Sequence, residues 1–244
     1  MTKLSVNINK VALIRNARGR DFPSVERFAE SCIELGAHGI TLHPRPDQRH
    51  ARYSDVRVLK TLCDKYGVEL NVEGYPSDEF LRVVLEAEPT QCTLVPDDPD
   101  QITSDHGWEV SRNAKLLEGA VYKLKERNIR TSLFVDHGTS ELGLIRDMGA
   151  DRIELYTEPY ADSFFDQLKL EPVLRSFRCT STAAQNLGLG VNAGHDLNLD
   201  NLDRFLSIPG IMEVSIGHSL VVESIERGIG KVLENYLKIV ANGN

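Results

Sequence analysis

The stretch Gly39-Ile40-Thr41-Leu42-His43-Pro44-Arg45-Pro46-Asp47-Gln48-Arg49-His50 decides the fold. It opens as a short apolar run with β-branched residues, which is typical of a fully buried strand. Two prolines end the run, and His43, Arg45, Arg49 and His50 follow. A buried strand that ends in cations and imidazoles is typical of an active site at the carboxyl end of a parallel sheet.

The same alternation of strand and helix patterns continues along the chain. Apolar runs predict strands at residues 4–8, 38–43, 69–73, 91–95, 131–135, 152–156, 189–192 and 212–216. Helical spacing predicts helices at residues 23–36, 54–67, 77–85, 117–128, 142–149, 160–187, 202–206 and 222–240. We expect Ser54 and Ser77 to be N-caps, and the long helical region 160–187 to break before Pro172.

Repeated strand–helix units of this kind favour a closed (β/α)8 TIM barrel that forms a single domain over residues 1–244. An open doubly wound sheet stays an alternative. However, the sequence has no G-x-G-x-x-G fingerprint that would support it.

Composition limits the classes of function. The net charge of −8 and the pI near 5.4 argue against nucleic-acid binding and against attachment to anionic lipid. The sequence has no run of about 18 apolar residues, as a membrane-spanning helix would need. We also find no apolar signal segment, so we expect a cytoplasmic protein. Cys32, Cys63, Cys92 and Cys179 show no metal-binding spacing, and we expect them to be buried, reduced thiols.

In a barrel of this type the catalytic groups gather at the carboxyl ends of the strands. The residues expected at that rim are Asn7, Asn9, His43, Arg45, Glu73, Pro96, Asp136, His137, Glu154, Thr157, Asn192, His195, Gly217 and His218. Glu73 ends a buried run, where burial would raise its pKa into a range useful for acid/base catalysis. Glu154 lies between Ile153 and Leu155 and should point into the barrel.

These residues also have structural interpretations. Glu73 and Glu154 could form ion pairs at the barrel mouth, and His43 could be a packed imidazole. We expect His38 to be structural, and His106 and His137 have that alternative too. Asp47, Asp97, Asp98 and Asp100 are expected to be solvated loop charges. The polar segment 96–108 is too long for a simple connection, which indicates a functional loop.

Three glycine-containing stretches could bind anions. Val191-Asn192-Ala193-Gly194-His195 and Val214-Ser215-Ile216-Gly217-His218-Ser219 each end a buried strand in small residues before a helix. Loops after strands 7 and 8 of barrels often present backbone N–H groups to a phosphate. Asn16-Ala17-Arg18-Gly19-Arg20 adds guanidinium groups, which match phosphate geometry. Together these stretches predict one or two phosphorylated small substrates.

The chain resembles the pyridoxine 5'-phosphate synthase family along essentially its whole length. The motifs that carry the resemblance are Val6-Asn7-Ile8-Asn9-Lys10, Arg15-Asn16-Ala17-Arg18-Gly19, Gly39-Ile40-Thr41-Leu42-His43, Arg49-His50, Asn71-Val72-Glu73, Leu94-Val95-Pro96, Val191-Asn192-Ala193-Gly194-His195 and Ile216-Gly217-His218.

The resemblance implies a (β/α)8 barrel with additional helices, assembled as a homo-octamer in the cytoplasm. The implied reaction condenses 3-amino-2-oxopropyl phosphate with 1-deoxy-D-xylulose 5-phosphate. It yields pyridoxine 5'-phosphate, inorganic phosphate and water, without a metal or an organic cofactor.

The resemblance also implies roles for individual residues. Acid/base catalysis falls on His43, Glu73 and His195, and transition-state stabilisation falls on Glu154. The contacts to the amino-ketone phosphate fall on Asn7, Arg18, Gly217 and His218. The contacts to the deoxyxylulose phosphate fall on Arg45, His50 and Thr103, the last in a loop similar to one that closes over the substrates.

The chain departs from the family pattern at three positions. Many members of the family have an aspartate–histidine pair where this chain has Asn9-Lys10, and that pair helps to bind the deoxyxylulose phosphate. The glycine expected after the second catalytic histidine is Asp196. The substrate contacts at Asn9, Lys10 and Asp196 must therefore differ from the family pattern.

Two other classes of function stay open. A metal-dependent barrel hydrolase would use His43, Glu73, His195 and His218 as ligands. Such barrels usually need a His-x-His after strand 1, whereas this chain has Asn7-Ile8-Asn9. A substrate-binding barrel without activity is the second alternative, although all the implied catalytic positions keep residues that can transfer protons.

Overall fold

The computed structural model describes residues 1–97, 101 and 103–243. Its strands are β1 (Lys3–Asn7), β2 (Gly39–Leu42), β3 (Glu69–Gly74), β4 (Gln91–Leu94), β5 (Arg130–Val135), β6 (Arg152–Tyr156), β7 (Gly190–Gly194) and β8 (Ile211–Ile216). They pair in parallel in chain order, and β8 pairs with β1 to close a barrel. The predicted TIM-barrel fold is therefore confirmed.

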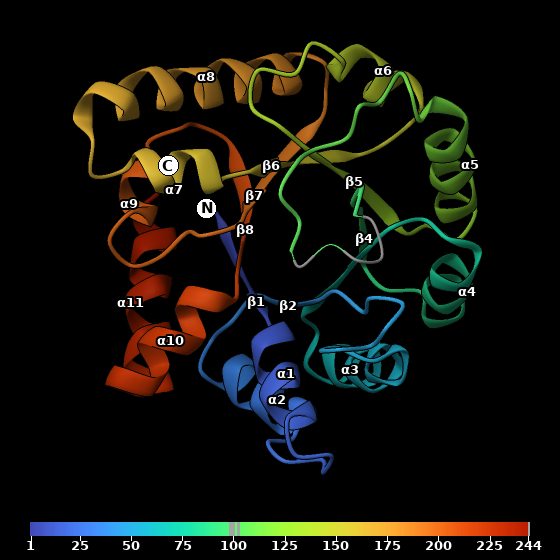
Figure 1. Cartoon of the computed structure of the whole chain (residues 1–244), viewed down its shortest axis with the longest axis vertical. Helices are drawn as coiled ribbons and strands as arrows, with labels where there is room; N and C mark the ends of the chain where they lie inside the picture. The colour runs from blue at the N-terminus through green and yellow to red at the C-terminus, as the bar shows by residue number, and fades with distance from the viewer. Residues whose placement is uncertain (98–100, 102, 244) are drawn as a thin grey trace.

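Helices surround this barrel (Figure 1). In the described part of the chain they are α1 (Asn9–Asn16), α2 (Val25–Glu34), α3 (Tyr53–Tyr66), α4 (Asp78–Ala87), α5 (Ala114–Lys125), α6 (Leu142–Asp147), α7 (Glu158–Ser163), α8 (Gln167–Asn186), α9 (Leu202–Phe205), α10 (His218–Arg227) and α11 (Ile229–Asn242). No helix in the described ranges is long and apolar enough to cross a membrane.

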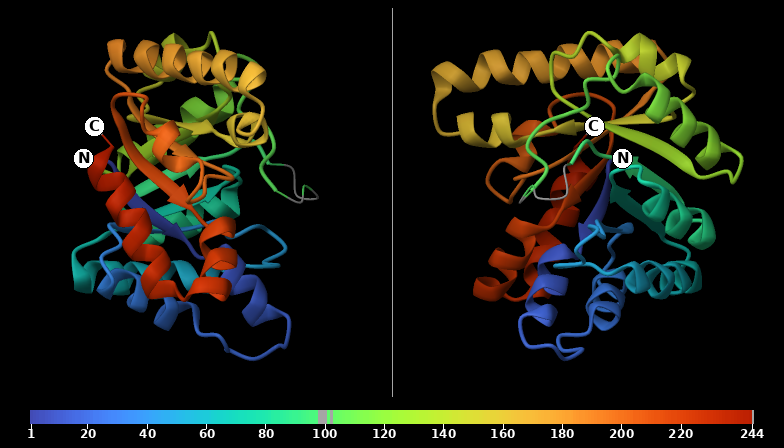
Figure 2. Two further views of the ribbon diagram at one scale, coloured as in Figure 1. Left: turned by 90° about the vertical axis from the view of Figure 1, so that its left-hand side faces the viewer. Right: turned by 45° about the vertical axis from the view of Figure 1, so that its right-hand side comes forward.

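Burial explains the strand patterns. Every residue of β2, β4 and β6 is buried, as expected for strands with a packed interior on one side and helices on the other. One large apolar cluster joins the outer strand faces to the inner helix faces, for example Leu4 of β1 to Tyr236 of α11. Both termini lie together at one end of the barrel, and residues 103–108 lie at the other end (Figure 2).

Several helix boundaries differ from the sequence predictions. Residues 9–16, directly after β1, form α1, for which we predicted no helix. The final helix is two helices that meet at Gly228, where φ is +80°. The interruption in the long region 160–187 falls at residues 164–166, and Pro172 lies inside α8 instead of next to a break.

The capping predictions had mixed outcomes. The Ser77 hydroxyl accepts from the backbone N–H of Phe80 at 3.2 Å, so this N-cap is confirmed. The Ser54 prediction was wrong, because α3 begins one residue earlier, at Tyr53, and Asp55 accepts the backbone N–H of Arg52 at 2.7 Å. The Asp55 carboxylate, in the first turn of α3, therefore has the capping role that was predicted for Ser54.

The structure also tests the predictions for the cysteines and for His38. Cys32, Cys63 and Cys92 are buried, but Cys179 is exposed on α8, so that part of the cysteine prediction was wrong. His38 is structural as expected, since its Nδ1 accepts the backbone N–H of Leu4 at 3.1 Å.

The loop after β4 is anchored on its carboxyl-terminal side. The Trp108 indole N–H donates to the carbonyl of Leu94 at 2.8 Å, and its backbone N–H donates to the carbonyl of Phe134 at 3.0 Å. A side chain at Gly107 would lie 2.3 Å from the backbone nitrogen of Asp136, so only glycine fits there. This packing fixes where the loop returns to the barrel mouth.

Candidate active site

A cavity of about 380 Å³ opens at the carboxyl ends of the strands. It is lined by Asn7, Asn9, Lys10, Leu13, His43, Arg45, His50, Glu73, Val95, Thr103, Ser104, Phe134, Glu154, Glu158, Gly194, His195, Asp196, Leu197, Ser215, Ile216, Gly217, His218 and Ser219. Except for Arg18, every residue to which the family resemblance assigned a catalytic or binding role lines this cavity. The other residues expected at the rim are not among the lining residues, namely Pro96, Asp136, His137, Thr157 and Asn192.

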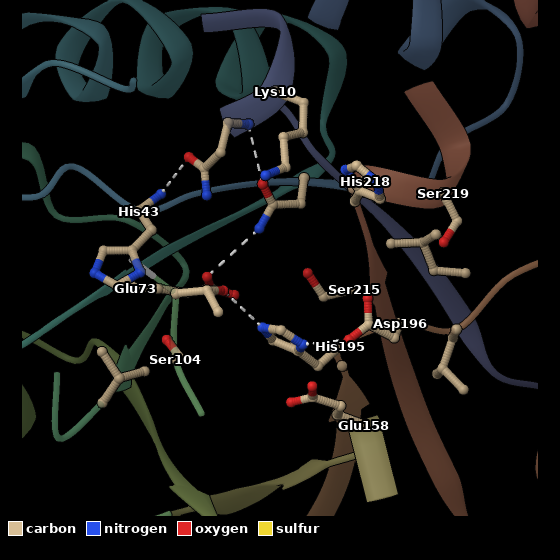
Figure 3. Close-up of a pocket in the computed structure, with 18 of the residues that line it drawn as sticks. Lys10, His43, Glu73, Ser104, Glu158, His195, Asp196, Ser215, His218 and Ser219 are labelled. Atoms are coloured by element: carbon tan, nitrogen blue, oxygen red, sulfur yellow. Dashed lines mark hydrogen bonds and ion pairs between the residues drawn. The ribbon is translucent and has the colours of Figure 1, made fainter. Parts of the chain in front are cut away.

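The acid/base candidates come from separate strands and face one space (Figure 3). His43 follows β2, Glu73 lies in β3, Glu154 lies in β6 and His195 follows β7. The closed barrel brings these strand ends together, although the residues are far apart in the sequence.

Neighbouring side chains hold His43 and Glu73 in position. The Asn9 amide oxygen accepts the backbone N–H of His43 at 2.9 Å. The Asn7 amide nitrogen donates to the Glu73 carboxylate at 3.5 Å, and the Asn7 oxygen accepts the backbone N–H of Asn9 at 3.0 Å. The end of β1 therefore orients groups on β2 and β3.

Glu154 lies deeper in the barrel. The Thr93 hydroxyl lies 3.3 Å from its carboxylate. A side chain at Gly194 would come within 2.5 Å of the same carboxylate, so glycine at the end of β7 makes room for Glu154. This requirement gives a physical reason for the glycine at position 194.

Both buried carboxyl groups are shifted toward the protonated form. Burial, together with the negative charges of Glu154 and Asp97, raises the pKa of Glu73 well above its usual value. Burial and the charge of Glu213 raise the pKa of Glu154 to about 8, against the opposing effect of the Thr93 hydrogen bond. At neutral pH these groups can therefore donate protons.

The imidazoles beside them are shifted the other way. Burial and the positive charge of Arg45 hold the pKa of His43 well below its usual value. The same causes lower the pKa of His50 to about 4. The two rings meet edge to face, with their centroids 6.1 Å apart. Neutral imidazoles can accept a proton from a substrate.

Arg45 is already engaged within the protein. It forms a buried ion pair with Asp97, and its Nη1 donates to the carbonyl of Gln101 at 2.9 Å. Ser104 donates to the same Asp97 carboxylate at 2.7 Å. The prediction that Asp97 is solvated was wrong, because this aspartate joins the end of β4 to the loop that follows β2. Asp47 is exposed as predicted, while Asp98 and Asp100 lie outside the described residues.

The Arg15-Asn16 part of the arginine motif is structural. The Arg15 guanidinium is buried and binds both carboxylate oxygens of Asp55, at 2.7 and 3.0 Å. The Asn16 amide donates to the carbonyls of Arg49 and His50 at 3.0 and 2.8 Å. These contacts fix the backbone that carries His50.

Arg18 lies elsewhere. It sits in an exposed turn after α1 and does not line the cavity of its own chain. The sequence could not reveal this separation from Arg15, because both arginines belong to one short motif.

The wall formed by β1 and β8 has the geometry of an anion site. α10 begins at His218, and its N-terminus opens into the cavity at Gly217. A side chain at Gly217 would lie 3.0 Å from the Asn7 Cβ and 3.1 Å from its carbonyl oxygen. Glycine therefore lets the start of the helix approach β1, beside Lys10.

The sequence interpretation singled out neither Ser104 nor Glu158, which also line the cavity. Ser215 and Ser219 belong to the predicted anion-binding stretch, and both line the cavity. Glu158 begins α7 directly after β6, so its position at a strand end could have signalled it. Burial raises the pKa of Glu158, against the opposing charge of His195.

Within the described residues, metal-ligand geometry occurs at Glu158, His195 and Asp196, whose ligand atoms lie within 4.8 Å of one another. The ligand set of the metal-hydrolase alternative, His43, Glu73, His195 and His218, does not form such a group there.

Comparisons with known proteins point to one family. Residues 4–242 match the family model described as "Pyridoxal phosphate biosynthesis protein PdxJ". A pyridoxine 5'-phosphate synthase from Parabacteroides distasonis is 50% identical over 237 residues, which cover 97% of this chain and 98% of that relative. One from Chelativorans sp. is 48% identical over 240 residues, which cover 96% and 97%.

Among solved structures, a thiamine phosphate pyrophosphorylase from Pyrococcus furiosus superimposes with a TM-score of 0.65 at 19% identity, covering 98% of this chain and 95% of its own. This likeness supports the fold alone. The family match over nearly the whole length is the stronger finding, and the chain therefore belongs to the PdxJ family of pyridoxal phosphate biosynthesis proteins.

Proposed function

We propose that this chain is an enzyme that condenses 3-amino-2-oxopropyl phosphate with 1-deoxy-D-xylulose 5-phosphate and closes the pyridine ring of pyridoxine 5'-phosphate. The observation that carries the proposal is the convergence of His43, Glu73, Glu154 and His195 on one cavity. Carbonyl–amine condensation, dehydration and aldol-type closure each move protons. Several acids and bases with pKa values near neutrality are therefore needed in one place.

The directions of the pKa shifts suggest which groups donate protons and which accept them. Glu73 and Glu154 have raised pKa values and would supply protons to departing hydroxyl groups. His43 has a lowered pKa and would accept a proton from a carbon or nitrogen of the substrates. His195, on the opposite wall, would serve as the second imidazole.

Two anion sites would flank these groups. Asn7, Gly217 and His218 lie at the α10 N-terminus and would bind the amino-ketone phosphate. Arg45, His50 and Thr103 lie on the other side and would bind the deoxyxylulose phosphate, with Arg45 shared between that phosphate and Asp97.

The remaining positions keep the roles that the family resemblance implies, with different chemistry. Lys10 would offer an ammonium where an imidazole is expected. Asn9 can offer its amide nitrogen as a donor, while its oxygen already accepts the backbone N–H of His43. Arg18 is proposed as a contact to the amino-ketone phosphate, although its turn lies outside the cavity.

We also propose a single domain over residues 1–244, a homo-octameric assembly and a cytoplasmic location.

Product formation tests the proposed reaction. Purified protein supplied with both phosphates should generate the absorbance and fluorescence of a pyridinol ring together with inorganic phosphate. Neither signal should develop when either substrate is omitted. Release of phosphate without the pyridinol chromophore would contradict the proposed ring closure.

A further inference from the structure

The carboxylate of Asp196 contacts the ring nitrogen Nδ1 of His195. Asp196 is the next residue in the chain, yet its Oδ2 lies 2.9 Å from the His195 Nδ1 (Figure 3). Consecutive side chains of an extended strand point to opposite faces, so this contact depends on the local backbone. Both residues have positive φ, +96° for His195 and +57° for Asp196.

The unusual backbone is held from two sides. The Thr157 hydroxyl donates to the carbonyl of Gly194 at 2.8 Å and also contacts the carbonyl of His195. The Asn201 amide donates to the carbonyl of Asp196 at 3.0 Å. The turn that brings the carboxylate to the imidazole is therefore built into the fold.

The ionisation of Asp196 determines what this contact does. The hydrogen bond from His195 lowers the pKa of Asp196 against the effect of burial, and the nearby charges of His218 and Lys10 lower it further. An ionised carboxylate can only accept, so the His195 Nδ1 must carry the proton. The Nε2 then faces the cavity, where the Thr103 hydroxyl lies 3.0 Å away.

We infer that Asp196 is a positioning residue that holds His195 in the Nδ1–H tautomer, with Nε2 directed at the substrates. The inference rests on the acid/base role proposed for His195. A carboxylate below a catalytic imidazole fixes its tautomer and its orientation, as in hydrolase triads.

The inference accounts jointly for the three departures from the family pattern. The chain has an amide at Asn9 where a carboxylate is expected, and a carboxylate at Asp196 where glycine is expected. Lys10 places an ammonium near this new carboxylate and helps to keep it ionised. In this chain the amide of Asn9 lies on the His43 side of the cavity and the carboxylate of Asp196 lies on the His195 side.

The decisive variant is Asp196→Gly, since glycine accepts a φ of +57° without strain and should leave the fold intact. We expect kcat to fall about tenfold, a fraction of the full effect of an acid/base group, with KM for either substrate changed less than about twofold. Nitrogen-15 NMR of the histidine rings should show the Nδ1–H tautomer of His195 dominant in the unmodified protein and mixed in the variant. Asp200→Gly, an exposed aspartate of the same loop, is the matched control and should change neither readout.

Three results would overturn the inference. One is an unchanged tautomer and kcat in Asp196→Gly, and another is an equal loss in Asp200→Gly. The third is loss of activity with a chelator and recovery with a divalent cation, because the His195 ring or the Asp196 carboxylate would then be a metal ligand. His195→Gln tests the proposed function separately from this inference. An active variant would refute the acid/base role of His195. If the variant is inactive, that role holds and the Asp196→Gly result decides the inference.

Discussion

The two ends of the barrel are both rich in charge, but they use it differently. At the amino-terminal end Glu69 pairs with Lys3 and Arg130, and Arg152 lies 3.8 Å from Glu213. At the carboxyl-terminal end Glu73 and Glu154 have no ion pair with a lysine or arginine among the described contacts, and they are shifted toward the neutral form.

The difference appears in the pKa shifts of Glu69 and Glu73, which lie toward the two ends of β3. Burial alone would raise the pKa of Glu69, but the hydrogen bonds from Lys3 and Arg130 outweigh it and lower the value. Among the described contacts Glu73 accepts from the Asn7 amide and from no lysine or arginine, and burial dominates its pKa shift. A charge that is paired stabilises the fold, whereas an unpaired one at the mouth is available for chemistry. Each prediction below tests this division of roles.

Glu73→Gln should have the largest effect. Turnover should fall by about 10³-fold, because an amide keeps the shape of the carboxyl group but cannot exchange its proton. Binding of inorganic phosphate and the thermal midpoint should change little. Steady-state assays of pyridinol formation measure the loss, with the exposed Glu79→Gln on α4 as the matched control. A fully active Glu73 variant would remove this residue from the mechanism.

Arg152→Met should show the opposite pattern at the other end. It removes the nearest cation from the buried Glu213, whose pKa burial already raises, and it breaks the 3.0 Å hydrogen bond to Asn192. We expect a loss of about 3 kcal/mol in the free energy of unfolding, as when one partner of a buried ion pair is removed. The kcat per folded molecule should stay within about twofold of its original value. Urea unfolding followed by fluorescence gives the first quantity; a selective loss of kcat with unchanged stability would contradict the division of roles.

Glu154→Gln should change how stability depends on pH. The pKa of Glu154 is raised to about 8 in the folded chain, so between the ordinary glutamate pKa and about 8 the folded state holds a proton that the unfolded state has released. The free energy of unfolding should therefore fall as pH rises through this window, by up to about 5 kcal/mol. The glutamine variant should lack this component, so the variant should gain relative stability with rising pH. A difference that is constant from pH 4 to 9 would mean that the carboxyl group is not held neutral.

Arg18→Ala should have the smallest effect. Loss of one charge-assisted contact to a phosphate is worth about 1.5 kcal/mol, or about tenfold in KM for the amino-ketone phosphate, with the other KM unchanged. Arg20→Ala, in the same exposed turn, is the control. If Arg18→Ala changes neither KM value, Arg18 does not make the contact to the amino-ketone phosphate that the family resemblance implies.

The rim of the barrel could be predicted with useful accuracy. Parallel strands buried on both faces produce apolar runs, and a polar residue at the end of such a run has few other uses. His43, Glu73 and His195 were recognisable for this reason, and all of them line the cavity. Glu158 was missed because the helix after β6 was predicted to begin at residue 160, which left Glu158 in an unassigned connection.

The burial and pairing of individual charged residues were less predictable. Arg15 and Arg18 stand in one motif, yet Arg15 is buried against Asp55 and Arg18 is exposed. Asp97 looked like a solvated loop charge and is instead the buried partner of Arg45. Pairing between residues this far apart in the sequence depends on which loops meet in space, and the local sequence does not contain that information.

The sequence by itself determined the barrel and the residue types at its mouth, because hydrophobic periodicity and the carboxyl-end rule are local. Only the tertiary structure decided which charges are paired and which are left free, and that Asp196 turns back onto His195. Those features depend on burial and on distances of a few ångströms between separate segments, and the free energy of a charge is sensitive to both.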